Sequence, residues 1–259
     1  MEAEDWAGLD GDAGERYERL LVAPIFEEWA PRVLDAGGVT TGDRVLDVAC
    51  GTGIVARHAI RRVGREGSVV GLDLTEPMLR VAERIEPAVE WVLGDATALP
   101  FPDESFDVVV SQAGLMFFPD RIQAVSEMGR VLVSGGRLAI QVWAASVAQQ
   151  AFAAVVERHA GAEMAEHYLA PWSMPDPDQL ARVVTEAGFS DVSARTEDGT
   201  SLFASLDAFL ATGTAVLLKD LSDPEALIAD VAEAFAPYRT ADGEYHIPQP
   251  GNIAVATKI

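Results

Sequence analysis

Residues 45–53 read Val45-Leu46-Asp47-Val48-Ala49-Cys50-Gly51-Thr52-Gly53, and the helical pattern Ile54-Val55-Ala56-Arg57-His58-Ala59-Ile60 follows directly. An apolar strand therefore runs into a turn with two glycines and then into a helix. Glycine has no Cβ, so a ligand can lie against the backbone of such a turn. The free amides of the first helical turn point into the same space. This stretch predicts a nucleotide-like ligand at the end of a strand.

Two kinds of cofactor fit this turn. Residues 51–56 also satisfy the G-x-G-x-x-A pattern of dinucleotide-binding turns, which hold nicotinamide or flavin cofactors. Asp73 ends a second apolar run, Val69-Val70-Gly71-Leu72, at a position where a carboxylate can accept hydrogen bonds from both ribose hydroxyls. Both interpretations use Asp73, so these two features leave the choice of cofactor open.

Later segments separate the two interpretations. A third apolar run, residues 89–93, leads to Asp95 and Ala96, where a carboxylate or an amide can meet an adenine edge. A fourth unit, Ser105-Phe106-Asp107-Val108-Val109-Val110-Ser111-Gln112, and then Arg130-Val131-Leu132-Val133-Ser134-Gly135-Gly136-Arg137-Leu138 follow in order. With these motifs the chain resembles the class I S-adenosylmethionine-dependent methyltransferases. It is most similar to the branch related to the quinone-biosynthesis methyltransferases, from about Tyr17 to Trp143.

The resemblance implies a role for each motif residue. In the family, the positions of Ala49 to Gly53 wrap the methionine part of the cofactor and Asp73 binds the ribose. Leu74 and Met78 flank the adenine, Asp95 and Ala96 read its edge, Gln112 lies beneath the transferred methyl, and Tyr17 reaches the methionyl end. The expected S-adenosylmethionine-binding set is Tyr17, Ala49, Cys50, Gly51, Gly53, Asp73, Leu74, Met78, Asp95, Ala96, Gln112 and Phe117. Ala49 stands where the family usually has a third glycine.

Apolar runs alternate with helical patterns along the chain, which is typical of a parallel sheet covered on both faces. Strands are expected near 44–49, 68–73, 89–93, 106–111 and 137–142, and two last strands at 191–197 and 252–258. The resemblance implies an α/β fold: a Rossmann-like three-layer sandwich with a mostly parallel seven-stranded sheet, an antiparallel last strand and a helical substrate cover. Residues 146–170 and 203–236 have helical patterns.

One methyltransferase domain is expected over residues 16–259, after an acidic, disordered N-terminus at 1–15 that is unstructured to about Asp12. Within it we expect lid helices at 16–43, broken at Pro24, and the cofactor-binding core at 44–143. A helical cover is expected at 144–190 and 200–240. Phe26 and Trp29, in the lid segment, suit packing on the core as well as they suit the lid.

Charge and cysteine usage restrict the partners and the location. The formal charge is −22, from 41 acidic and 19 basic residues, which opposes binding to nucleic acid or to an anionic membrane. Cys50 is the only cysteine, so no intramolecular disulfide or cysteine-based zinc site can form. No apolar run approaches the roughly 18 residues of a membrane span. We expect a cytoplasmic protein without a metal, either a monomer or a homodimer.

The chemistry of the acceptor is less well defined by the sequence. Gly114-Leu115-Met116-Phe117-Phe118-Pro119-Asp120 follows Gln112 and is apolar, which favours an apolar, aromatic or polyketide-like acceptor; Trp143 and Trp172 suit the pocket wall or the core equally. His58, His159 and His167 are expected at surface positions, and His246 is a weak pocket candidate. No catalytic residue is identified.

The sequence therefore predicts methyl transfer from S-adenosylmethionine to a small, fairly apolar molecule at O, C or N, with S-adenosylhomocysteine as the product. Two alternatives stay open. One is a protein of this fold that binds the cofactor without transferring methyl. The other is an NAD-dependent oxidoreductase, which the segments after residue 89 disfavour.

Overall fold

Seven strands form the central sheet of the computed structural model, which describes residues 13–212, 221 and 223–259. Their spatial order is β3-β2-β1-β4-β5-β9-β6. The bounds are β1 (Arg44–Val48), β2 (Ser68–Asp73), β3 (Glu90–Leu93), β4 (Phe106–Gln112), β5 (Leu132–Trp143), β6 (Ser190–Glu197) and β9 (Gly251–Thr257). Strands β1 to β5 pair in parallel, and β9 is antiparallel to both of its neighbours. The predicted sheet is confirmed, including its antiparallel last strand.

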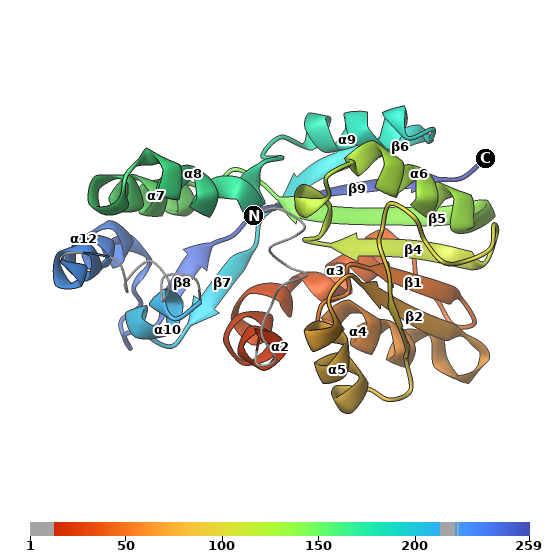
Figure 1. Cartoon of the computed structure of the whole chain (residues 1–259), viewed down its shortest axis with the longest axis horizontal. Helices are drawn as coiled ribbons and strands as arrows, with labels where there is room; N and C mark the ends of the chain where they lie inside the picture. The colour runs from red at the N-terminus through yellow and green to blue at the C-terminus, as the bar shows by residue number, and fades with distance from the viewer. Residues whose placement is uncertain (1–12, 213–220, 222) are drawn as a thin grey trace.

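Helices cover both faces of this sheet (Figure 1). Strand residues alternate between the faces, so Val45 and Val69 pack with α3 (Trp29–Ala36) and α4 (Ile54–Val63). Leu46 and Leu72 pack on the other face with α6 (Arg121–Val131) and α9 (Pro177–Glu186). Helix α5 (Glu76–Ile85) lies beside β2 and β3. Because parallel strands buried on both sides need two layers of helices, the Val- and Leu-rich runs lead to a three-layer sandwich, as expected.

The N-terminal segment is helical from Ala13 and differs from the prediction in where it breaks. Helix α2 (Ala13–Tyr17) continues into the π-helix η1 (Glu18–Phe26), and α3 begins at Trp29. Pro24 lies inside η1, so the predicted break at Pro24 is wrong by three residues. A π-helical turn bonds residues five apart, and the wider turn accommodates a proline that has no N–H to donate. Residues 13–15, expected within the disordered N-terminus, belong to α2, so the prediction is wrong there; residues 1–12 lie outside the described part of the chain.

Beyond Trp143 the chain builds a second group of elements with a hydrophobic core of its own. It consists of α7 (Val147–Ala160), α8 (Ala162–Leu169), η4 (Ala170–Trp172), β7 (Thr200–Phe203), α10 (Leu206–Leu210), α12 (Pro224–Phe235), η5 (Ala236–Tyr238) and β8 (Tyr245–Pro248). Phe152, Phe209 and Phe235 lie at the centre of this core. We call this group the cover; in Figure 1 it lies beside the carboxyl ends of the parallel strands.

The cover is not purely helical, which corrects the helical cover expected over residues 200–240: β7 occupies its first four residues, whereas α10 and α12 lie within the helical pattern predicted at 203–236. Strands β7 and β8 form a separate antiparallel pair in which Ser201 faces Ile247 across the register. Each strand has only four residues, too few for an alternating pattern to stand out in the sequence. The helix expected over 146–170 is also divided, because Gly161 adopts a φ of +90° between α7 and α8.

No helix among the described residues is long and apolar enough to cross a bilayer.

Candidate functional site

The glycine turn after β1 is held from two sides by buried carboxylates. Asp73, at the end of β2, accepts the Gly51 amide at 2.8 Å through Oδ2. Its Oδ1 accepts the amide and the hydroxyl of Thr75 at 2.9 and 2.6 Å. Asp47 accepts the Ala56 amide at 3.0 Å and so satisfies one of the free N–H groups in the first turn of α4. The two carboxylates therefore fix the shape of the turn.

Burial changes the protonation of this region. It raises the pKa of Asp47 to about 8, and the neighbouring Asp73 charge adds to this effect. One Asp47 oxygen also has no partner among the described residues. Burial raises the pKa of Asp73 too, against the hydrogen bonds from Thr75 and Gly51 that lower it. The pKa of the Tyr17 hydroxyl is raised by burial and by the Asp73 charge. The end of the sheet is thus a poorly solvated region in which acidic groups lie close to the turn.

The π-helix η1 lies across the glycine turn and is anchored there by three contacts. Glu18 forms a mostly buried ion pair with Arg57 of α4 at 2.9 Å. The Gln112 amide at the end of β4 donates to the Phe26 carbonyl at 3.1 Å. The Tyr17 and Phe26 rings stack at 5.4 Å, and a Cβ placed on Gly51 would lie 3.5 Å from the Tyr17 ring. These contacts position the Tyr17 ring over the turn.

A cavity of about 410 Å³ opens between the strand ends, η1 and the cover. Ten of the twelve residues expected to bind the cofactor line it: Tyr17, Ala49, Gly51, Asp73, Leu74, Met78, Asp95, Ala96, Gln112 and Phe117. Four separate strands bring these positions together, because the carboxyl ends of parallel strands meet at one edge of the sheet. The cavity continues past Phe117 to the cover, where aromatic side chains and glutamines line it.

Cys50 and Gly53, the other two expected residues, do not line this cavity. Gly53 has a φ of +89°, and a Cβ there would lie 2.3 Å from the Trp91 ring. The Cys50 thiol is buried on the same side, near Gly71 and Trp91, and burial raises its pKa. The side of the turn away from the cavity therefore packs against Trp91, and a cofactor contact at Cys50 or Gly53 remains a prediction for their backbone atoms.

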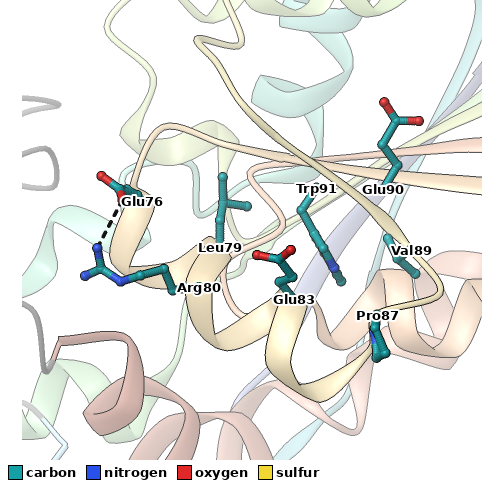
Figure 2. Close-up of a pocket in the computed structure, with 8 residues that line it drawn as sticks. All are labelled: Glu76, Leu79, Arg80, Glu83, Pro87, Val89, Glu90 and Trp91. Atoms are coloured by element: carbon teal, nitrogen blue, oxygen red, sulfur yellow. Dashed lines mark hydrogen bonds and ion pairs between the residues drawn. The ribbon is translucent and has the colours of Figure 1, made fainter.

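Trp91 separates the glycine turn from a second hollow of about 400 Å³ between α5 and β3 (Figure 2). Its indole N–H donates to the Glu86 carbonyl at 3.1 Å, and Glu76 pairs with Arg80 at 3.2 Å on the rim. None of the predicted site residues lines this hollow.

Among the described residues, no cluster of three or more histidine, cysteine or acidic side chains could hold a metal ion. The cavity at the strand ends is therefore the candidate site.

Comparison with known proteins agrees with this geometry. Residues 46–140 match the family model described as a methyltransferase domain. The chain is 36% identical over 212 residues to a demethylmenaquinone methyltransferase of Renibacterium salmoninarum, with 76% of this chain and 88% of that protein covered. It is 36% identical over 194 residues to a 2-phytyl-1,4-naphtoquinone methyltransferase of Thermosynechococcus vestitus, with 68% and 86% covered. The chain belongs to the class I S-adenosylmethionine-dependent methyltransferases.

The comparison with solved structures shows the same fold. A solved phosphoethanolamine N-methyltransferase 2 of Haemonchus contortus, in complex with S-adenosylmethionine, has a TM-score of 0.62 at 21% identity, with 96% of this chain and 57% of that chain covered. As a member of the family shown by the sequence comparisons, the methyltransferase described here uses S-adenosylmethionine, as its sequence predicts, and the NAD-dependent alternative is set aside.

The cover contributes cavity residues of this methyltransferase that the sequence did not identify. His167 is exposed, as expected, and also lines the cavity, as do Gln149, Tyr168, Ser201 and Gln249. None of these residues belongs to a recognisable sequence motif, so their position in the cavity wall is known only from the structure. Phe118, Trp143 and Trp172 also line the cavity, which agrees with the pocket-wall alternative of the sequence analysis.

The other aromatic and histidine candidates have other partners. Trp29 is fully buried in the core. His58 bonds Glu27 at 3.0 Å, and His159 bonds Asp230 at 2.8 Å. His246 lies near Glu244 at 3.4 Å on the exposed face of β8 and does not line the cavity.

Proposed function

We propose that this methyltransferase transfers the methyl group to an uncharged, quinol-type aromatic ring held between Phe117 and the cover. The observation that carries the proposal is the composition of the acceptor end of the cavity. Among the described lining residues, the acids are Asp73 and Asp95, both at the ends of strands, and there is no lysine or arginine. An acceptor with an anionic group would find no lysine or arginine to pair with in the described wall, and burying an unpaired charge is costly.

Aromatic side chains supply the rest of that wall. Phe117, Phe118 and Trp143 line it from the sheet side, and Tyr168 and Trp172, which stack at 5.8 Å, line it from the cover. Flat apolar walls suit a flat ring, and aromatic pairs add stabilisation beyond the area they bury. Relatives at 36% identity are named for naphthoquinone-type substrates, which supports an acceptor of this class.

The cofactor end is assigned to the strand-end residues. Asp73 would hold the ribose, Leu74 and Met78 would flank the adenine, and the backbone of the glycine turn would meet the methionine part. The cradle fits such a group because the turn presents Gly51, without a Cβ, to the cavity, and a buried Gln112 oxygen has no partner among the described residues. Bound there, S-adenosylmethionine would supply a methyl group activated by the sulfonium: a carbon or oxygen of the acceptor would bond to this methyl as its S–C bond breaks, S-adenosylhomocysteine would leave, and the acceptor would lose a proton.

The protein's own part is to bind, align and exclude water. Alignment alone can supply much of the rate of such a transfer, because it makes the reaction effectively unimolecular. The ion pair of Glu18 with Arg57 and the hydrogen bond from Gln112 to Phe26 keep η1 closed over the cofactor end. His167 is an imidazole in the cavity wall that can take the acceptor's proton.

An acceptor panel tests this proposal. The protein is incubated with S-adenosylmethionine carrying a labelled methyl group and with either reduced 1,4-naphthoquinone, the oxidised quinone or phosphoethanolamine. We expect label only in the reduced naphthoquinone, since the electron-rich ring is the nucleophile. Label in phosphoethanolamine would contradict the uncharged acceptor. Bound cofactor with no labelled product from any acceptor of the panel would favour the alternative of binding without transfer.

A further inference from the structure

The cover contains polar groups that face the cavity without partners. Ser201 is 2% exposed, and its hydroxyl has no hydrogen-bond partner among the described residues. The indole N–H of Trp172 is likewise buried and without one. Both residues line the cavity. A buried donor left unsatisfied costs about 1–3 kcal/mol, so such a pair in one cavity calls for an explanation.

Strand geometry directs Ser201 inward. Along β7, Ser201 and Phe203 are buried while Leu202 between them is exposed, so one face of the strand looks into the protein. Across the pair, Ser201 is in register with Ile247, which is also buried and lines the cavity. The inward face of the small sheet is therefore a wall of the cavity, with Ser201 as its polar position.

A relay of hydrogen bonds runs from Tyr168, which stacks on Trp172, to Gln249, which directly follows β8. The Tyr168 hydroxyl donates to Gln149 Oε1 at 2.7 Å, and Gln149 Nε2 donates to Gln249 Oε1 at 2.8 Å. Each bond fixes the orientation of the next amide, so the Gln249 nitrogen is left as a donor at the end of the relay. Tyr168 stacks on Trp172 with ring centroids 5.8 Å apart. Burial raises the pKa of Tyr168, which keeps its hydroxyl a donor.

We propose that Ser201, Trp172 and Gln249 form an acceptor subsite that donates hydrogen bonds to the ring oxygens of an uncharged aromatic acceptor. This inference rests on the proposed function and adds the groups that recognise the acceptor. A quinone or quinol presents two oxygens on opposite sides of a flat ring, and each oxygen can accept such a bond. The donors are neutral, which matches the absence of lysine and arginine from the described wall.

Gln149 and Tyr168 are positioning residues of this subsite. They act through Gln249, whose amide they orient. Tyr168→Phe removes the first donor of the relay while keeping the ring that stacks on Trp172. We expect this variant to raise the KM for the acceptor about fivefold, the equivalent of one net hydrogen bond, and to leave kcat unchanged. A purely structural role for the hydroxyl would lower stability without this separation of KM from kcat.

Binding of two matched compounds tests the subsite directly. The first, 2,3-dimethyl-1,4-naphthoquinone, has both oxygens but no free carbon in its quinone ring for methyl transfer or thiol addition. The second, 2,3-dimethylnaphthalene, is the same hydrocarbon without oxygens. Both are titrated into the protein saturated with S-adenosylhomocysteine, for the wild type and for Ser201→Ala and Trp172→Phe. Leu202→Ala, on the exposed face of β7, serves as the matched control.

We expect the wild type to prefer the quinone by about tenfold or more, as two net hydrogen bonds allow. Ser201→Ala and Trp172→Phe should each reduce the affinity for the quinone about fivefold and leave that for the hydrocarbon unchanged. Wild-type affinity for the quinone in both variants would overturn the subsite while the proposed acceptor class stands. If S-adenosylhomocysteine binds but the wild type binds neither compound, the acceptor class itself fails, and the subsite with it.

Discussion

The Asp73 carboxylate accepts the Gly51 amide at 2.8 Å, so the end of β2 fixes the turn that follows β1. We propose that the same carboxylate has a second task, to offer its remaining lone pairs to the cofactor in the cavity. On this proposal, two strands together build the cofactor position.

Replacing Asp73 tests both tasks. We expect Asp73→Ala to weaken S-adenosylmethionine binding about 10- to 100-fold or more, since charge-assisted hydrogen bonds contribute about 1.5–3 kcal/mol each. Titration calorimetry measures the affinity, and thermal unfolding shows whether the chain still folds. Thr75→Val is the control: it removes one donor to Asp73 but keeps the carboxylate, and should change the affinity far less. Unchanged affinity in Asp73→Ala would remove Asp73 from the binding set.

Gly53 tests the packing behind the turn. A Cβ at Gly53 would lie 2.3 Å from the Trp91 ring, whereas Gly42 has the same φ of +89° and open space around it. Both alanine variants carry the cost of a left-handed conformation, about 1–2 kcal/mol. Only Gly53→Ala adds overpacking, which costs a further ~1–3 kcal/mol. Urea unfolding of the two variants measures the difference in their free energies of unfolding. Equal free energies would show that the Trp91 ring moves aside without an energetic cost.

Asp47 gives the protein a distinctive pH dependence. The pKa of this group is about 8 in the folded chain and 3.8 as its ordinary value. Between these values the unfolded chain has released a proton that the folded chain keeps, so the free energy of unfolding falls as the pH rises through this window. Above it no further loss follows from this group.

We expect Asp47→Asn, which resembles the protonated side chain, to remove this slope. Urea unfolding from about pH 5 to about pH 9 measures it. The variant should gain stability relative to the wild type as the pH rises, because it has no charge to bury. Parallel pH profiles for the two proteins would contradict the burial of Asp47 as a neutral group.

His167 is tested as the proton acceptor. We expect His167→Gln to lower kcat about 100-fold or more and to leave the affinity for S-adenosylmethionine unchanged, since a general base contributes at least this much. Its activity should recover as the pH rises and the acceptor ionises in solution. His246→Gln, on the exposed face of β8, is the matched control. A wild-type kcat in His167→Gln would show that the proton leaves without this imidazole.

The fold was largely predictable because the strands that carry the site are also its strongest hydrophobic runs. Valine-rich segments such as residues 106–112 are apolar on both faces, and a parallel sheet covered by helices on both sides buries both faces. The motif positions lie at the ends of these segments. The glycine turn and Asp73 could therefore be placed at one edge of the sheet from the amino-acid sequence alone. Pro24 was misleading because proline usually breaks a helix, whereas here it lies inside a π-helix that packs over that edge of the sheet.

The acceptor side was much less predictable. Ser201 lies on a four-residue strand, and its partner strand lies more than forty residues later, so no local pattern reports their pairing. Gln149 and Gln249 meet across 100 positions of sequence. Such polar contacts arise when the elements of the cover pack together. Their residues have no regular spacing in the sequence, so no sequence pattern predicts them. The residues that would choose the acceptor were therefore found only from the structure.

A single-turnover experiment tests the central claim most directly. The protein, saturated with S-adenosylmethionine and in excess over the acceptor, is mixed with reduced 1,4-naphthoquinone, and mass spectrometry quantifies both products. We predict equal amounts of S-adenosylhomocysteine and of a naphthoquinol that is heavier by one methylene unit. Intact S-adenosylmethionine beside an unchanged naphthoquinol, under conditions where both bind, would contradict the assignment of this cavity as the site of methyl transfer to a quinol ring.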